Sequence, residues 1–462
     1  MAIRSKVKTS FVCQECGYDS PAFMGKCPEC GEWNSLKEFK DLSSSTPGRA
    51  QSDSVLAASQ SKPQKLSEVT SQKNLRIKTN FTEFDTVLGG GLVLGSAILL
   101  AGDPGIGKST LLLQLCLALA NSGKTVLYIS GEESVEQIKL RADRITTFSK
   151  GSNKKEYKTD SLLLVSLSDP DVAIMHIETI KPHLIVVDSI QTMQSNNLEG
   201  LSGSVGQVRY SGLHFIRTAK ALQIPLILVG HVTKEGMVAG PMVLSHMVDT
   251  VLFLEGEKFA NTRILRSLKN RFGPVDEVGI FSMEEAGMVE VTNPEQIFLS
   301  KSSDSVPGSV LVATLEGSRA FLVELQALVV YSKLPMPRRV VSGVDQRRVE
   351  LLLAVLQKHV RLPVETMDVF VNVAGGLKIT DPGVDLGICL AIYSSLKNIP
   401  LPRTVGIAEV GLLGELRMVP GLEKRVRESG KLGYTSVLTA QSHKTLNEAL
   451  SSLSKLDRAV AK

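Results

Sequence analysis

The segment GDPGIGKST, Gly102–Thr110, carries the most readily assigned chemistry in this chain. It fits the phosphate-loop pattern G-x-x-x-x-G-K-[ST] at every position. In this pattern the glycines turn backbone N–H groups toward an anion, Lys108 reaches the outer phosphates of a nucleotide, and Ser109 ligates a magnesium ion. We therefore predict that ATP binds the phosphate loop, which consists of Gly102, Asp103, Pro104, Gly105, Ile106, Gly107, Lys108, Ser109 and Thr110.

The flanks of the phosphate loop support this interpretation. Apolar Ala97–Ala101 predicts a buried strand, and Ser109–Asn121 predicts an apolar helix that ends at Ser122-Gly123. A phosphate loop needs a strand before it and a helix after it, because the helix N-terminus adds unpaired N–H donors and the positive end of its dipole. The alternative is a glycine-rich turn that binds nothing, and Lys108 together with these flanks argues against it.

Carboxylates follow two other predicted strands. Leu184–Val187 is an apolar run that ends at Asp188, the position at which phosphate-loop enzymes order magnesium through its water shell. Glu132 and Glu133 follow the predicted strand Val126–Ser130. Because the carboxyl ends of parallel strands meet at the edge that holds the phosphate loop, we predict that one of the two, preferably Glu132, orients the attacking water. The alternative is that these carboxylates only cap the following segments.

Three further polar residues are candidates for the same chemistry. His231 follows the predicted strand Pro225–Gly230, so it should lie at the same edge, sense the terminal phosphate and move the glycine-containing segment Lys234–Pro241. Lys269 and Arg271, in the segment KNRFG, would share one face of a strand. Phosphoryl transfer gains from cations supplied in trans, although an isolated basic pair is usually only solvated.

Four of the six cysteines crowd the N-terminus as Cys13-x-x-Cys16 and Cys27-x-x-Cys30. Paired knuckles of this spacing are typical of a tetrahedral thiolate zinc site, which we interpret as structural because all four ligands come from the protein. Disulfides suit a secreted chain, and an iron–sulfur site is the remaining alternative. Cys116 and Cys389 lie in apolar helical patterns and are predicted core residues.

Length and composition set wider limits. The 462 residues are enough for two or three domains. A net charge of +5 permits an acidic partner without demonstrating one, and 5% aromatic residues disfavour an extended base-stacking platform. Neither a signal sequence nor an apolar run of the roughly 20 residues of a membrane span occurs. We therefore expect a cytoplasmic protein with no membrane partner.

The pattern along the chain predicts four regions. Residues 1–40 form the zinc module, 41–65 a flexible Ser-, Ala-, Gln- and Lys-rich linker, 66–295 an α/β domain with a mainly parallel sheet, and 296–462 a second α/β domain without a phosphate loop. Within the α/β domain, Thr146–Asp160 is a polar, lysine-rich surface insertion or, alternatively, a basic contact patch. In the second domain we expect strands over Val310–Glu316, Phe321–Val329, Val369–Val373, Arg403–Glu409 and Ser436–Thr439, and helices over Arg347–Val360 and Val384–Lys397.

The motifs together resemble a known family. The double knuckle, GDPGIGKST, SGEES, VVDSIQT, GHVTKEG and KNRFG occur in one order that is similar to that of the bacterial RadA (Sms) DNA repair proteins over essentially the full chain. The resemblance implies a RecA-like ATPase domain and a C-terminal domain like that of the Lon protease. It further implies ATP-driven branch migration of recombination intermediates on single-stranded and branched DNA, in a hexameric ring, with the RecA recombinase as an expected partner.

The resemblance also implies roles for single residues. Lys108 and Ser109 take the phosphate and magnesium roles, Glu132 the catalytic carboxylate, Asp188 the magnesium-ordering carboxylate and His231 the nucleotide sensor. Lys269 and Arg271 correspond to cations that reach a neighbouring subunit's ATP or support DNA-coupled motion. Ser195–Gly206 and Lys234–Pro241 correspond to the two DNA-facing loops. The chain departs from the family pattern at Phe23, Met24, Met242 and Ser245, and the last two put the DNA contacts in doubt.

The Lon-like region lacks the Ser–Lys pair that a Lon-type protease would need. Asp385 stands at the position of the nucleophile, Glu423 falls on the expected lysine, and Lys424 is one place away. Two carboxylates cannot form a nucleophile–base pair, so we predict a catalytically inactive scaffold that closes the ring. The clusters Arg338-Arg339 and Arg347-Arg348 are either DNA contacts or solvated surface.

The leading hypothesis is therefore a DNA-stimulated ATPase and helicase that acts in recombinational DNA repair. Three alternatives stay open on the sequence alone. The first is a RecA-class regulator that uses ATP as an assembly switch without mechanical work. The second is an ATP-dependent protease, and the third is a signalling kinase of related central fold.

Overall fold

The computed structural model describes residues 9–13, 18–29, 31–40, 76–148, 158–231, 239–256, 261–275, 277–291, 293, 299, 306–401, 403–434 and 436–460. The predicted linker 41–65 and the central part of the predicted insertion, residues 149–157, lie outside these ranges. Two compact units are present. The first comprises Met1–Leu254, Ser267–Pro274 and Glu285–Met288, and the second comprises Glu255–Arg266, Val275–Glu284 and Val289–Lys462. The predicted domain boundary at 295/296 stays a prediction.

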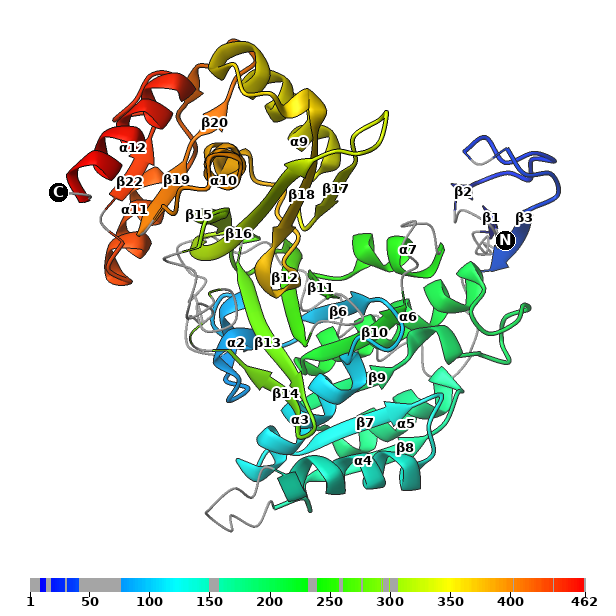
Figure 1. The fold of residues 1–462 in the computed structure, drawn as a ribbon. Helices are drawn as coiled ribbons and strands as arrows, with labels where there is room; N and C mark the ends of the chain where they lie inside the picture. Colours follow the sequence, from blue (N-terminus) through cyan, green and yellow to red (C-terminus); the bar gives the residue numbers. More distant parts are fainter. Residues whose placement is uncertain are drawn as a thin grey trace, which may run out of the picture. The chain divides into compact units, whose positions relative to one another are not determined.

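The N-terminal module is a small antiparallel sheet (Figure 1). Its strands are β1 (Thr9–Cys13), β2 (Asp19–Ser20) and β3 (Leu36–Lys40), in the order β2-β1-β3. A buried cluster of Cys13, Cys27 and Leu36 forms its core. So small a core contributes little stability by itself, which is why a module of this size needs a metal.

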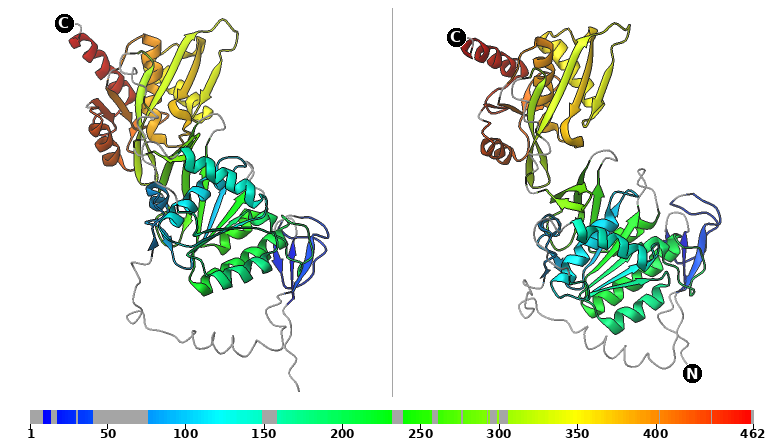
Figure 2. Two further views of the ribbon diagram at one scale, coloured as in Figure 1. Left: turned by 90° about the horizontal axis from the view of Figure 1, so that it is seen from below. Right: turned by 60° about the horizontal axis from the view of Figure 1, so that its bottom comes forward.

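A twisted sheet forms the body of the first unit, with helices on both faces (Figure 2). Its parallel part has the order β11-β6-β10-β9-β7-β8. The bounds are β6 (Ala97–Gly102), β7 (Val126–Ser130), β8 (Leu162–Ser166), β9 (Leu184–Asp188), β10 (Leu226–His231) and β11 (Thr250–Glu255). Beyond β11 the strand order continues with β12 (Thr262–Asn270), β13 (Val278–Glu284) and β14 (Gly287–Glu290).

Five of the described helices follow strands of the parallel part of the sheet, as parallel crossovers require. They are α3 (Lys108–Asn121), α4 (Val135–Phe148), α5 (Pro170–Ile180), α6 (Val205–Leu222) and α7 (Ala239–Met247). A further helix, α2 (Thr82–Val87), precedes β6. β6, β7 and β9 are buried throughout, because helices cover both faces of these strands. The predicted α/β fold with a mainly parallel sheet is therefore confirmed. The observed strands agree to within one residue at each end with the four predicted ones, Ala97–Ala101, Val126–Ser130, Leu184–Asp188 and Pro225–Gly230.

The second unit contains a mixed six-stranded sheet in the order β17-β18-β16-β15-β19-β22. The strands are β15 (Ser309–Glu316), β16 (Arg319–Tyr331), β17 (Arg339–Ser342), β18 (Met367–Val373), β19 (Thr404–Ile407) and β22 (Ser436–Thr439). Its helices are α9 (Gln346–Val355), α10 (Asp385–Lys397), α11 (Leu422–Lys431) and α12 (Leu446–Val460). One core packs on one face of the sheet, and a smaller one around Leu311, Leu322 and Leu422 packs on the other.

Two predicted elements of the second unit differ from the observed ones. The predicted strand Arg403–Glu409 is divided at Ala408, because the backbone of Ala408 bonds to Gly383 and Leu386 next to α10 instead of to a strand. A short hairpin of β20 (Glu409–Val410) and β21 (Leu416–Arg417) follows. The predicted helix Arg347–Val360 is α-helical only to Val355 and ends in a π-helical turn over Leu356–Val360. None of the described helices is long and apolar enough to cross a membrane.

Candidate nucleotide site and zinc module

The phosphate loop has the backbone that its glycines predict. Gly102 has a φ of +154° and Gly107 a φ of +112°, which is the left-handed side of the map that other residues avoid. A Cβ atom on Gly102 would also collide with the carbonyl oxygen of Leu254 on the neighbouring strand β11. α3 begins at Lys108, so the N-terminal N–H groups of this helix lie at the end of the loop. This strand–loop–helix unit can hold an anionic phosphate group.

Lys108 lies at the centre of the predicted site. Its side chain is 3% exposed, and its Nζ donates to the carbonyl oxygens of Gly102 at 2.8 Å and Asp103 at 2.9 Å. Burial lowers the pKa of Lys108, and the carboxylates of Asp188, Asp103 and Glu132 act in the opposite direction. The predicted phosphate-binding lysine and two of the predicted carboxylates therefore lie close enough to interact.

Asp188, the predicted aspartate at the end of β9, has a hydrogen-bond partner that the sequence motifs do not indicate. Tyr128 on β7 donates its phenol O–H to Asp188 Oδ2 at 2.5 Å. The two strands are neighbours, with Tyr128 paired to Val186 and Ser130 paired to Asp188. Burial and the adjacent carboxylate raise the pKa of Tyr128 well above its ordinary value, so the phenol remains a donor. The available signal was a tyrosine within the otherwise apolar strand, since a buried phenol needs a hydrogen-bond partner.

The two candidate glutamates have different partners. Glu132 Oε1 accepts a hydrogen bond from Ser189 Oγ at 2.6 Å, so it turns toward the residue that follows Asp188. Glu133 instead forms an ion pair with Arg141 on α4, and its backbone N–H donates to Ser130 Oγ. Of the two glutamates, Glu132 is thus the one that contacts the segment after β9, and its role in orienting water stays a prediction.

The donor set suits a magnesium ion. Ser109 supplies a hydroxyl and Asp188 a carboxylate, and magnesium prefers hard oxygen ligands, usually one or two protein groups with water and phosphate oxygens completing the shell. Both residues lie at the edge where β6 and β9 end. The chemistry of these side chains therefore fits the predicted ion.

His231 lies at the same edge. It ends β10, and the register of the parallel pair places it opposite Gly102, the first residue of the phosphate loop. The structure describes the backbone of His231 but not its side chain. The predicted moving segment Lys234–Pro241 lies outside the described residues up to Ala239, where α7 begins.

The two cations of KNRFG lie at the opposite end of the parallel strands, where β6 begins. Lys269 Nζ donates at 2.8 Å to the carbonyl oxygens of Ser245 and Val248 at the end of α7. Arg271, 56% exposed, pairs at 3.4 Å with Asp249, which is 4% exposed and hydrogen-bonds to the backbone of Ala97 at the start of β6. The phosphate loop begins at the other end of β6. Five residues of strand, about 16 Å at ~3.3 Å per residue, separate these cations from the loop of their own chain.

The turn that follows Lys269 is fixed by contacts of its other residues. Asn270 Oδ1 accepts from the N–H of Phe272 at 3.0 Å, and Arg76 donates to the carbonyl of Phe272 at 2.5 Å. A Cβ on Gly273 would come within 3.1 Å of the Cα of Gly89, so a larger residue here would force its neighbours to shift. These contacts fix the backbone of the segment that carries Lys269 and Arg271.

The first predicted DNA-facing loop is anchored at its base and exposed at its tip. Gln207 Nε2, on α6, donates to the carbonyls of Ser195 at 3.1 Å and Leu198 at 2.7 Å, and Leu201 at the tip is 80% exposed. The prediction extended the loop to Gly206, but α6 already begins at Val205. The loop contains no Lys or Arg, so its contacts to phosphate would come from N–H and hydroxyl groups.

The zinc module brings two of its predicted ligands together. Cys13 and Cys27 are both buried in one cluster. The Cys13 N–H donates to the carbonyl of Tyr18 at 2.8 Å, and the Gly31 N–H to that of Cys27 at 2.9 Å, which closes the turn of each knuckle. Cys16 and Cys30 lie outside the described residues, so the described part of the chain does not by itself assemble a complete metal site. At the departures from the family pattern, Phe23 packs edge-on against Phe11 and Met24 packs against the cluster.

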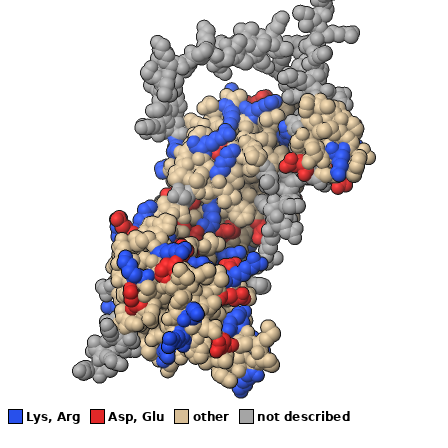
Figure 3. Space-filling model, turned by 90° about the horizontal axis from the view of Figure 1, so that it is seen from above, with Lys and Arg blue, Asp and Glu red and all other residues tan. Residues whose placement is uncertain are grey.

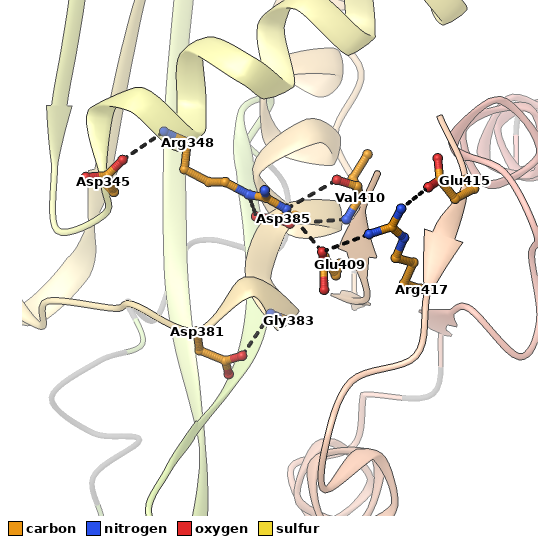
Figure 4. A network of polar contacts seen from close by, with 9 residues as sticks. All are labelled: Asp345, Arg348, Asp381, Gly383, Asp385, Glu409, Val410, Glu415 and Arg417. Carbon is orange, nitrogen blue, oxygen red and sulfur yellow. Dashed lines mark hydrogen bonds and ion pairs between the residues drawn. The ribbon is translucent and has the colours of Figure 1, made fainter. Parts of the chain in front are cut away.

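In the second unit, the predicted inactive site is an ion-pair network (Figure 4). Asp385, 1% exposed at the start of α10, pairs with Arg348 of α9 and accepts the Val410 N–H at 3.1 Å. Burial raises the pKa of Asp385, and the bonds from Arg348 and Val410 oppose that shift. Glu423, the second carboxylate of this predicted site, is exposed on α11. Asp385 is committed to a structural ion pair.

Two models of known protein families match parts of this chain. A family model described as "AAA domain" matches residues 60–237, and one described as "Rubredoxin metal binding domain" matches residues 11–38. The DNA repair protein RadA of Halalkalibacterium halodurans is 46% identical over 94% of this chain and 93% of its own length. That of Bacillus subtilis is 46% identical over the same shares of the two chains. The chain belongs to the RadA family.

Membership in the RadA family confirms the predicted resemblance. The chain carries an AAA/RecA-like ATPase domain that binds ATP and an N-terminal zinc ribbon. Among solved structures, that of the RadB recombinase is similar, with 24% identity, a TM-score of 0.36, and coverage of 46% of this chain and 99% of the other. The Lon-like assignment of the C-terminal region stays a prediction.

Replacing Cys27 by Ser is expected to remove zinc from this RadA-family chain. A hydroxyl is a far weaker zinc ligand than a thiolate, and the metal contributes much of the stability of so small a module. Metal analysis should give about one zinc per chain in the parent and a large loss in the variant. The buried Cys116 on α3 offers a control, because Cys116→Ser should retain the zinc. Iron with visible absorbance in the parent would contradict the prediction.

Replacing Arg348 by Ala is expected to lower the free energy of unfolding of the second unit by about 3 kcal/mol, because it leaves the buried Asp385 carboxylate without its ion-pair partner. Arg417→Ala is the control, since Arg417 is 57% exposed and pairs with the partly exposed Glu409 and Glu415. That change should cost less than about 1 kcal/mol. Calorimetry on both variants measures the difference, and equal shifts would refute a structural role specific to the Arg348–Asp385 pair.

Proposed function

We propose that this chain is a DNA-stimulated ATPase that drives branch migration of recombination intermediates in recombinational DNA repair. Support comes from its similarity to DNA repair proteins over 94% of its length and from its AAA/RecA-like domain. The proposed assembly is a homo-oligomeric ring, a hexamer as the family resemblance implies. The proposed location is the cytoplasm.

The observation that carries the proposal is the position of the two cations relative to the phosphate loop. Lys269 and Arg271 lie beside Asp249 at the start of β6, and the phosphate loop follows the other end of that strand. No rotamer of either side chain spans a separation of about 16 Å. If Lys269 and Arg271 take part in ATP hydrolysis, they would therefore act on ATP bound to the phosphate loop of a neighbouring subunit. Sites shared in this head-to-tail manner are the kind that closed rings contain.

The residues at the loop edge have distinct proposed roles. The phosphate loop would hold ATP, with Lys108 on the outer phosphates and His231 as the sensor of the terminal one. Magnesium, held by Ser109 and ordered by Asp188, would neutralise charge on the phosphates. Glu132 would orient the attacking water, because it already reaches the segment after β9 through Ser189. Lys269 and Arg271 of the neighbour would stabilise the charge that develops during transfer.

The proposed partners are single-stranded and branched DNA and the RecA recombinase. The proposed DNA contacts are the tip of Ser195–Gly206 and the segment Lys234–Pro241. On the face drawn in Figure 3, Lys and Arg occur in small separate groups among Asp, Glu and other residues, so the charge on this face does not indicate a binding groove. The DNA contact is therefore proposed from the loops and not from a basic patch.

Two of the alternatives are less well supported. A protease would need a nucleophile where Asp385 is held by Arg348, and casein digestion by the purified chain would test this. A kinase would transfer the terminal phosphate of ATP to itself, which labelled ATP would reveal. An ATP-operated assembly switch without motor activity remains the main competitor, since it needs the same nucleotide site.

One experiment separates the motor from the switch. The ATPase rate is measured with and without single-stranded DNA, together with branch migration on a joint molecule and the symmetry of particles by electron microscopy. A motor should hydrolyse ATP faster with DNA, move the branch only with hydrolysable ATP, and form rings. A protein that assembles with ATP but leaves the branch in place would be the switch.

A further inference from the structure

Tyr128 offers a role that neither the sequence motifs nor the proposed function uses. Its phenol is the described donor to the Asp188 carboxylate, at 2.5 Å to Oδ2. Tyr128 is 1% exposed and Asp188 9% exposed, so both groups are largely shielded from water. In such surroundings a hydrogen bond between an O–H and a carboxylate is strong and fixes the orientation of both groups.

The hydrogen bond from Tyr128 engages one of the two oxygens of the Asp188 carboxylate. Oδ2 is occupied by Tyr128, and none of the described residues donates a hydrogen bond to Oδ1. The next residue, Ser189, donates to Glu132 at 2.6 Å. Two hydroxyls thus orient the two neighbouring carboxylates at this edge. A Cβ on Gly131 would collide with the Thr192 side chain, so these segments pack closely and the carboxylates have little room to turn.

We propose that Tyr128 is a positioning residue that orients the Asp188 carboxylate for the magnesium ion accompanying ATP. This inference rests on the proposed ATPase function. Magnesium tolerates little departure from octahedral geometry, so a carboxylate that orders its water shell must be held in one orientation. Outer hydrogen bonds to groups that serve a metal typically contribute 10- to 100-fold in metal affinity or activity. Tyr128 acts through Asp188 and touches neither nucleotide nor ion.

The test is Tyr128→Phe, which removes the phenol oxygen and keeps the ring in its buried site. Binding of a fluorescent ATP analogue is measured with magnesium and with EDTA. We expect the affinity in EDTA to change less than about twofold, because the phosphate loop is intact, and the gain in affinity on adding magnesium to fall about tenfold. The magnesium concentration that half-saturates ATP hydrolysis should rise by a similar factor.

A matched control and a double variant keep the test specific. Tyr210 is also buried and its phenol lies 3.4 Å from Asp171, so Tyr210→Phe removes a comparable group away from the nucleotide edge and should leave the magnesium gain unchanged. In an Asp188→Asn background, Tyr128→Phe should have no further effect on that gain, since the two residues form one coupled unit. Thermal melting of each variant measures whether the fold is intact.

The outcomes separate the inference from the proposed function. If the parent binds and hydrolyses ATP while Tyr128→Phe keeps the full magnesium gain, the positioning role is wrong and the ATPase assignment stands. Equal losses of affinity in EDTA and in magnesium would also overturn it, because they indicate a purely structural defect. A parent that neither binds nor hydrolyses ATP would instead refute the proposed function.

Discussion

Lys108→Ala is expected to reduce ATP hydrolysis by at least about 100-fold and to abolish DNA movement, because the lysine neutralises charge on the outer phosphates where it develops. The fold should survive, since the described contacts of Lys108 Nζ are two carbonyl oxygens of the phosphate loop itself. Steady-state turnover with saturating ATP and magnesium measures the effect, and thermal melting reports on the fold.

Lys139→Ala supplies the control for this measurement. Lys139 lies on α4, is 64% exposed and, within the described part of the chain, forms an ion pair with Asp143 one turn away, so its removal should leave turnover unchanged. A folded Lys108→Ala protein with near-normal turnover would refute the assignment of the nucleotide site.

The second large effect is expected from Lys269→Ala and Arg271→Ala. Nucleotide affinity should change modestly, because the phosphate loop of the same subunit holds the ground state. Hydrolysis should fall by about 100-fold or more, since cations supplied in trans matter most where charge develops in transfer. The affinity for a fluorescent nucleotide and the turnover of the assembled protein, measured side by side, provide the comparison.

Lys220→Ala is the matched control for these two variants. Lys220 pairs at 3.0 Å with the same Asp249 carboxylate as Arg271 but comes from α6 and not from KNRFG. If all three variants lose the same activity, disturbance around Asp249 explains the defect. A loss confined to Lys269→Ala and Arg271→Ala would favour a direct role.

Mixed assemblies test whether these cations act between subunits. In an equal mixture of Lys269→Ala and Lys108→Ala chains, about a quarter of the interfaces pair an intact phosphate loop with an intact Lys269 from the neighbour. Partial recovery of ATPase activity should follow. If assembly is confirmed and no activity returns, the role in trans is wrong. The cations would then be candidates for DNA contacts, and DNA binding should weaken less steeply with salt in the variants.

Much of the fold could be predicted because the necessary signals are local. Buried parallel strands are continuous apolar runs, which is why Leu184–Asp188 and Val126–Ser130 were predicted with their observed bounds. Prediction was wrong where a tertiary contact overrode the local pattern. The chain leaves the sheet at Ala408 because its backbone bonds to Gly383, just before α10, and to Leu386, in the first turn of α10, and no pattern around residue 408 indicates these partners.

The sequence by itself determined the family, the phosphate loop and the cysteine knuckles, because the spacing of these residues along the chain is what their chemistry requires. The tertiary structure decided which side chains meet. It joins Tyr128 to Asp188, Ser189 to Glu132 and Arg348 to Asp385, and each pair comes from separate elements. It also places Lys269 at the end of the parallel strands that lies away from the phosphate loop of the same chain. Such pairings depend on strand order and register, which arise only when the whole sheet is assembled.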